Sequence, residues 1–158
     1  MDNRRSKENY YLDIAEAALE RSTCLRRQFG AIIVRDDEIV ATGYNGAPRG
    51  RRNCSDLGRC TRRELNIPAG ERYELCRSVH AEANAIISAA RRDMMGATLY
   101  LVGRDTATGS YYPETTPCAM CRRLIINAGI AQVVCRTGAD EYTTTLVRDW
   151  VYHDDSIG

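Results

Sequence analysis

Two short segments of this sequence carry side chains that together could hold a metal ion. One contains His80 and Glu82, and the other contains Cys118 and Cys121 directly after Pro117. An imidazole nitrogen and two thiolates suit Zn²⁺, and three protein ligands leave the fourth tetrahedral position open for water. The residues therefore favour a catalytic zinc site. The alternative is a closed structural site, in which a fourth cysteine fills the open position.

The spacing within each segment suggests different tasks for its residues. Cys118 and Cys121 lie three residues apart, so on a helix they share one face. Glu82 follows His80 by two residues and does not share its face, so it is better placed to reach the open position and carry protons. Both segments are predicted to begin helices, whose positive ends lower the pKa of cysteine thiols.

The segments must be positioned by elements that alternate along the chain. Gly129 indicates the end of one of the helices. Hydrophobic spacing predicts helices over 6–21, 79–91 and 118–128, strands over 31–34, 39–44, 97–102 and 130–135, and a helix or strand in 143–152. Strands that alternate with helices predict an α/β fold, with a layered sheet covered by helices on both faces.

Composition indicates one globular domain over residues 1–158. The chain is 44% hydrophobic and 27% charged, and its net charge of +1 gives no overall attraction for long nucleic acid. No apolar run approaches the roughly 20 residues that span a bilayer, and the first ten residues are too polar for a secretory signal. We therefore expect a cytoplasmic protein that binds no membrane.

We interpret the polar stretch over residues 49–78 as an insertion, because loops of this length are uncommon unless they are functional or stabilised by an additional interaction. Seven cysteines are many for a cytoplasmic chain, where disulfides are rare. Cys118 and Cys121 belong to the first metal site, and Cys135 is expected in the core. The other four cysteines could form a complete Cys₄ site for a structural zinc: Cys24, Cys54, Cys60 and Cys76. The alternative is four reduced thiols in a flexible loop.

Arginines are concentrated in the same insertion. Most clusters of this kind are solvated surface, but this one could also contact an effector phosphate or another subunit. Its members are Arg49, Arg51, Arg52, Arg59, Arg62 and Arg63.

The pattern H-x-E followed by P-C-x-x-C is the signature of zinc-dependent nucleobase deaminases. Beyond it, the chain resembles deoxycytidylate (dCMP) deaminases in Gly30-Ala31, in GYNGAP at 43–48, in HAEANAI at 80–86 and in LIINAGI at 124–130. The resemblance implies a three-layer α-β-α, cytidine-deaminase-like fold with a mixed sheet of about five strands. It also implies hydrolysis of dCMP to dUMP and ammonia, which supplies dUMP for thymidylate synthesis.

The resemblance further implies roles for individual residues. Glu82 would carry protons from water to the ring nitrogen and then to the departing ammonia. Asn45 would contact the sugar, Arg91 would bind the 5′-phosphate from the same helix as His80, and Arg26 is a further phosphate candidate. Tyr142 could flank the nucleotide. The alternatives are a turn asparagine, a solvated arginine and a packing tyrosine.

A second zinc and nucleotide effectors also follow from the resemblance. Cys24 and Cys54 align with ligands of a second zinc in some relatives, whereas Cys60 and Cys76 would replace histidines. Regulated relatives are hexamers that dCTP activates with Mg²⁺ and dTTP inhibits. Their effector region corresponds here to Gly43, Tyr44, Asn45 and Gly46.

Other functions remain open from the sequence. The substrate could be cytidine, free guanine or adenosine in tRNA, although a tRNA enzyme should have a basic face and a free-base enzyme would not use a phosphate ligand. A non-catalytic zinc-held interaction module is another possibility. A DNA-uptake accessory protein is a third.

Overall fold

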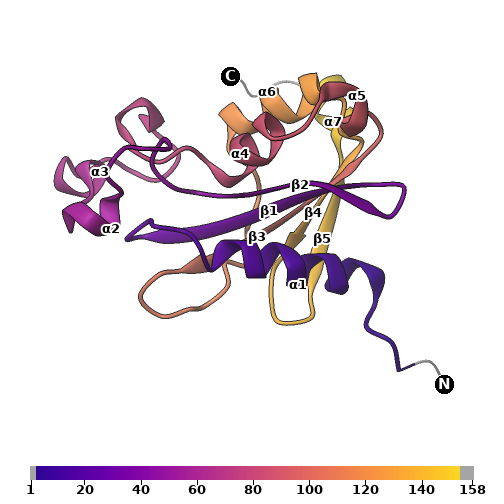
Figure 1. Cartoon of the computed structure of the whole chain (residues 1–158), viewed down its shortest axis with the longest axis horizontal. Helices are drawn as coiled ribbons and strands as arrows, with labels where there is room; N and C mark the ends of the chain where they lie inside the picture. The colour runs from indigo at the N-terminus through magenta and orange to yellow at the C-terminus, as the bar shows by residue number, and fades with distance from the viewer. Residues whose placement is uncertain (1–2, 154–158) are drawn as a thin grey trace.

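The computed structural model describes residues 3–153 and is built on one five-stranded mixed sheet (Figure 1). The strands lie in the order β2-β1-β3-β4-β5, and among them only β3 and β4 pair in parallel. Their bounds are Arg27–Arg35 for β1, Glu38–Tyr44 for β2, Thr98–Asp105 for β3, Gln132–Arg136 for β4 and Tyr142–Leu146 for β5. The predicted mixed sheet is confirmed.

Helices cover both faces of this sheet, as the sequence predicted (Figure 1). Helix α1 (Lys7–Leu19) packs Leu12 against Ile32 on one face, and the Ser6 side chain caps its N-terminus. The other face carries four helices: α4 (Ala81–Ile87), α5 (Arg91–Met94), α6 (Ala119–Ala128) and α7 (Val147–Tyr152). Two buried clusters therefore sandwich the sheet, which gives three layers.

The expected single helix over 79–91 is wrong, because the chain forms two shorter helices there. Helix α4 ends at Ile87, the backbone of Ala90 is extended, and α5 begins at Arg91. The Ser88 hydroxyl donates a hydrogen bond of 2.9 Å to the carbonyl of Asn84, a local bond that competes with regular helix continuation. The break places Arg91 at the start of α5 rather than on α4.

The end of the chain and the insertion are more regular than the sequence pattern suggests. Residues 142–152 form both a strand, β5, and a helix, α7. The insertion contains α2 (Cys54–Leu57), α3 (Thr61–Glu64) and a 3₁₀ helix, η1 (Tyr73–Leu75), and it lies beyond one end of the sheet (Figure 1). No helix within residues 3–153 combines the length and apolarity needed to cross a membrane.

Strand β2 and helix α4 approach each other at Gly43. A Cβ atom at this position would lie 2.4 Å from the carbonyl oxygen of Ala81 and 2.5 Å from the amide nitrogen of Ala85. Only glycine permits this approach, which seats the first turn of α4 directly on the sheet. Gly43 thus has a structural role in addition to the effector role that we predicted for it.

Candidate active site

The starts of helices α4 and α6 meet at the centre of the candidate site. His80 is the N-cap residue of α4 and Cys118 is the N-cap residue of α6. His80 Nδ1 lies 3.5 Å from Cys118 Sγ and 3.4 Å from Cys121 Sγ, and the three donor atoms all lie within 4.8 Å of one another. The structure therefore brings together three side chains from segments about 40 residues apart.

The donor atoms fit a tetrahedral zinc ion. Zinc bonds of about 2.0 Å to nitrogen and 2.3 Å to sulfur separate these two ligand atoms by about 3.5 Å at a tetrahedral angle. Both observed nitrogen–sulfur distances agree with that separation. Among residues 3–153, no further cysteine, histidine or carboxylate joins the group, so a fourth position stays open for a small molecule.

The two thiols have opposed protonation preferences. A hydrogen bond with Cys121, and a second with His80, lower the pKa of the Cys118 thiol. The same pairing with Cys118, together with burial, raises the pKa of the Cys121 thiol. A second thiolate beside the first therefore needs a cation to stabilise it, and a divalent metal ion supplies that charge.

Glu82 is buried at the same place. The residue is 5% exposed, and burial raises the pKa of its carboxyl group above the ordinary value. A carboxyl group with a raised pKa can hold and release a proton near neutral pH. Glu82, His80 and Cys118 all line one cavity, so this group faces the space where a substrate would react.

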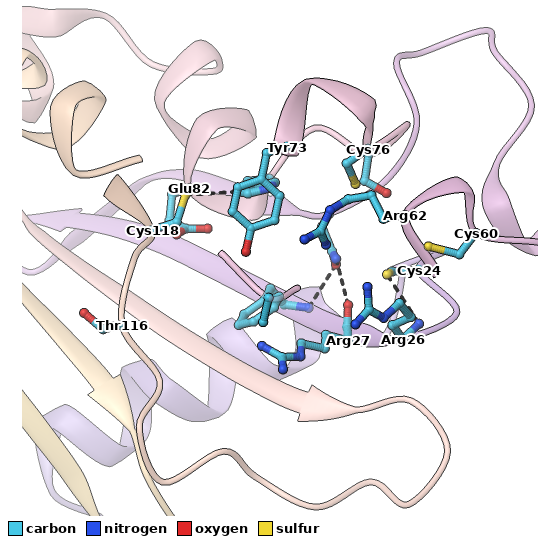
Figure 2. A pocket seen from close by; sticks show the side chains of 15 residues that line it. Cys24, Arg26, Arg27, Cys60, Arg62, Tyr73, Cys76, Glu82, Thr116 and Cys118 are labelled. Atoms are coloured by element: carbon cyan, nitrogen blue, oxygen red, sulfur yellow. Dashed lines mark hydrogen bonds between the residues drawn. The ribbon is translucent and has the colours of Figure 1, made fainter. Parts of the chain in front are cut away.

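The cavity has a volume of about 140 Å³ and draws its walls from distant parts of the chain. Figure 2 shows Glu82 and Cys118 toward one end and three arginine side chains toward the other. The lining residues are Cys24, Arg26, Arg27, Phe29, Asn45, Cys60, Arg62, Ala69, Tyr73, Cys76, Ser78, His80, Glu82, Thr116 and Cys118. The space thus combines a proton carrier and metal ligands with positive charge.

Asn45 lines this cavity, but its side chain also holds the fold together. Its Nδ2 donates a hydrogen bond of 2.8 Å to the carbonyl of Arg27, and its Oδ1 accepts one of 2.9 Å from the amide of Phe29. The Ser22 hydroxyl donates to the same oxygen. The turn role and the ligand role are therefore compatible, because one N–H of Nδ2 has no partner among these bonds.

Arg91 and Tyr142 do not line the cavity of this chain. Arg91 lies beyond the break after α4, and its Nε donates a hydrogen bond of 2.7 Å to the carbonyl of Asn127. Tyr142 begins β5 at the edge of the sheet. The prediction that placed Arg91 on the helix of His80 is wrong, because α4 ends too early. Arg26, the weaker phosphate candidate, does line the cavity.

Tyr73 and Arg27 line the cavity but were not predicted as site residues, and Arg62 was named only as a member of the arginine cluster. Tyr73 packs its ring edge-on against His80, with 4.8 Å between the ring centroids. The guanidinium of Arg62 lies 4.5 Å from the centre of the Tyr73 ring, and that of Arg27 lies 4.9 Å from the Tyr112 ring. For Arg62 the only sequence signal was the arginine cluster. The insertion has no apolar periodicity that could have placed Arg62 or Tyr73.

The four remaining cysteines of the predicted second zinc site lie near one another. Cys24, Cys60 and Cys76 line the cavity, whereas Cys54 is buried. Burial raises the pKa of the Cys54 thiol, and the neighbouring thiols of Cys24 and Cys76 raise it further. Their sulfur atoms do not meet within 4.8 Å in the described part of the chain, so this site stays a prediction.

The predicted effector region borders a second hollow. Gly43, Tyr44 and Gly46 line it together with Pro48 of the following turn and Ile87 of α4. Asn45 lines the first cavity instead. The segment 43–46 therefore separates two hollows, one of which contains the candidate catalytic residues.

Comparisons with known proteins agree with this geometry. Residues 5–137 match the family model described as the cytidine and deoxycytidylate deaminase zinc-binding region. A deoxycytidylate deaminase of Mycobacterium phage D29 is 42% identical over 132 residues, which cover 80% of this chain and 91% of the phage protein. A deoxycytidylate deaminase of Schizosaccharomyces pombe is 35% identical over 147 residues, and the match covers 92% of this chain but 42% of the yeast protein.

A solved structure extends the likeness to three dimensions. The dCMP deaminase of cyanophage S-TIM5, crystallised in complex with dCMP and dUMP, superposes with a TM-score of 0.57 at 26% identity. The match covers 85% of this chain and 84% of the phage chain. The arrangement of sheet and helices is therefore shared over most of both chains.

Proposed function

Since this chain belongs to the cytidine and deoxycytidylate deaminase family, we propose that it is a zinc-dependent enzyme that hydrolyses dCMP to dUMP and ammonia. The observation that carries the proposal is the convergence of His80, Cys118 and Cys121 beside the buried carboxyl group of Glu82. An open fourth position and an adjacent proton carrier are what a hydrolytic metal site needs, and a closed structural site has neither.

The residues of this chain divide the reaction between them. His80, Cys118 and Cys121 would hold Zn²⁺, a Lewis acid that makes water nucleophilic at neutral pH. Glu82 accepts a proton from the water that attacks the ring carbon bearing the amino group, and it donates a proton to the adjacent ring nitrogen. It then accepts the second proton of the former water molecule, from the hydroxyl group now bonded to the ring carbon, and delivers it to the amino group, which leaves as ammonia while the carbonyl forms. Burial, which raises the pKa of Glu82, suits it to both directions of transfer.

A small nucleotide is the substrate class that the cavity favours. The dCMP and dUMP in the cyanophage protein are small nucleotides, and the cavity of this chain is small as well, with a volume of about 140 Å³. Arg26 lines it and supplies positive charge for a phosphate, and Asn45 is available to the sugar through its remaining N–H. These contacts are part of the proposal.

A second zinc, bound by Cys24, Cys54, Cys60 and Cys76, belongs to the proposal as well. The mutual influence of these thiols on their pKa values supports it, since thiolates gathered in this way are stabilised by a metal ion. Such a zinc would hold an insertion that has little apolar core of its own.

Regulation and assembly are also proposed rather than established. The hollow beside Gly43, Tyr44 and Gly46 supports a site for dCTP with Mg²⁺, or for dTTP. The exposed apolar side chains of Ile87 on α4 and of Met120 and Leu124 on α6 support a homo-oligomer, for which we favour a hexamer in the cytoplasm.

The test is ammonia release from dCMP, dCTP, deoxycytidine and CMP, measured side by side with zinc content on one sample. We expect turnover of dCMP to exceed that of each of the other three substrates. Zinc-loaded protein that deaminates none of the four would overturn the proposal. Assays with cytidine, guanine and tRNA adenosine would then distinguish another deaminase activity from a non-catalytic role.

A further inference from the structure

Two arginine side chains that face the cavity have buried nitrogen atoms without hydrogen-bond partners. These atoms are Nε of Arg62 and Nη1 of Arg26. Arg62 is 7% exposed although it belongs to a polar insertion, and both residues line the cavity that contains Glu82 and His80. No ion pair joins either guanidinium to a carboxylate of residues 3–153.

Buried charge of this kind is costly unless a partner completes it. Native structures pair nearly all buried polar groups, and an uncompensated guanidinium loses its hydration without a return. The only carboxylate in the cavity wall is Glu82, which lies beside Cys118 rather than beside the arginines (Figure 2). The wall also contains the thiols of Cys24, Cys60 and Cys76, and within residues 3–153 none of them forms a hydrogen bond with either guanidinium. An anion that enters the cavity from outside the protein can therefore supply the missing partner.

Arg62 is fixed in position before any ligand arrives. Its Nη2 donates hydrogen bonds of 2.7 Å to the carbonyl of Pro68 and 2.9 Å to the carbonyl of Glu71. Its guanidinium also lies on the ring of Tyr73, which in turn contacts His80. A side chain held in this way loses little conformational freedom on binding, so it is suited to recognition.

We propose that Arg62 and Arg26 together bind the 5′-phosphate of the substrate, and that Arg62 lets the insertion select a nucleoside monophosphate over the nucleoside. The inference rests on the proposed function, because the base must lie at the end of the cavity that contains Glu82. The planar guanidinium of arginine matches phosphate oxygens with paired hydrogen bonds. Arg27 is a weaker candidate, since it is exposed and its guanidinium stacks on Tyr112.

The arrangement along the cavity supports this assignment. Figure 2 shows Arg62 between the Glu82–Cys118 end and Arg26. A nucleotide whose base reaches Glu82 would direct its sugar past Asn45 and its phosphate toward the arginines. The phosphate would then be the negatively charged partner that both guanidinium groups lack.

The test compares Arg62→Gln and Arg26→Gln with the control Arg63→Gln, which changes an exposed arginine of the same short helix, α3. We would measure kcat/KM for dCMP and for deoxycytidine, and the binding of dUMP and deoxyuridine. Each cavity variant is expected to lower kcat/KM for dCMP by roughly 10- to 100-fold and to change that for deoxycytidine by less than about threefold. The control should behave as the wild type.

An unchanged preference for dCMP over deoxycytidine in both cavity variants would overturn the inference and leave the proposed function intact. If Arg62→Gln disturbs folding, it should lose deoxycytidine turnover too. Arg26→Gln then decides, because the Arg26 side chain makes no hydrogen bond that its replacement would break within residues 3–153.

A wild-type protein that deaminates neither compound would refute the proposed function, and the binding measurements would then decide the phosphate site separately. Tighter binding of dUMP than of deoxyuridine, lost in both variants, supports the site. Equal binding of the two compounds by the wild type overturns it.

Discussion

Arg136 is a buried arginine outside the candidate site, and carboxylates of the protein itself balance its charge. Its side chain is 2% exposed, and it forms ion pairs of 2.9 Å with Asp13 and 3.1 Å with Glu16, both on α1. Arg62 is also buried, but it has no carboxylate partner within residues 3–153 and lines the cavity. Both side chains leave Nε without a hydrogen bond, so at the scale of single residues the missing ion pair distinguishes Arg62 from Arg136.

Acid should weaken the contact between α1 and the sheet through Asp13. Hydrogen bonds from Arg5 and Arg136 hold the pKa of the Asp13 carboxyl below its ordinary value of 3.8. The stabilisation is therefore present above about pH 4 and is lost as the pH falls through the lower pKa of the folded state. We expect Asp13→Asn to reduce the free energy of unfolding by about 1 kcal/mol at pH 7, a value discounted because the side chain is 47% exposed.

Denaturant titrations between pH 7 and pH 2.5 measure this effect. The difference between wild type and Asp13→Asn should shrink toward the acid end, because the wild-type carboxyl then becomes neutral as well. Asp36→Asn is the matched control, since the Asp36 side chain is 88% exposed in the β1–β2 turn. A difference that stays constant with pH would contradict this account of Asp13.

At the scale of elements, the N-termini of helices α4 and α6 position the candidate metal ligands. The sequence was sufficient to predict that His80 and Cys118 begin helices, because each motif follows a loop and precedes an apolar pattern. It was not sufficient for the end of α4, where the local bond of Ser88 competes with the helix, and Arg91 was misplaced as a result. Tyr73 was missed because its contact with His80 depends on tertiary structure alone.

The insertion is the element whose stability depends most on the proposed second zinc. We expect the wild type to bind about two zinc ions per chain and Cys54→Ser to bind about one. Loss of about 2 kcal/mol on removing this zinc would lower the melting temperature by roughly 5 °C. Metal analysis and thermal unfolding on the same preparations provide both quantities.

Cys135→Ala is the control for this experiment. Cys135 lies in β4, and burial raises the pKa of its thiol to about 12, so it is a core residue rather than a ligand. This variant should keep the wild-type zinc content. A zinc content of about one in the wild type, or no change in Cys54→Ser, would rule out the Cys₄ site.

At the scale of the whole molecule, three layers bring separate parts of the chain to one cavity. Close packing of β2 on α4 at Gly43 seats His80 and Glu82, and α6 brings Cys118 to the same place. The insertion closes the other side with Arg62 and Tyr73 (Figure 2). The layered fold followed from the alternation of strands and helices, whereas the wall made by the insertion could not be read from its polar sequence.

The most direct measurement is ammonia release from dCMP by the wild type and by Glu82→Gln, with zinc content determined on both. Glutamine keeps the size of the side chain but cannot carry a proton. We expect the variant to keep its zinc and its fold while turnover falls by roughly 1,000-fold. A Glu82→Gln protein that deaminates dCMP at the wild-type rate would contradict the mechanism at its centre.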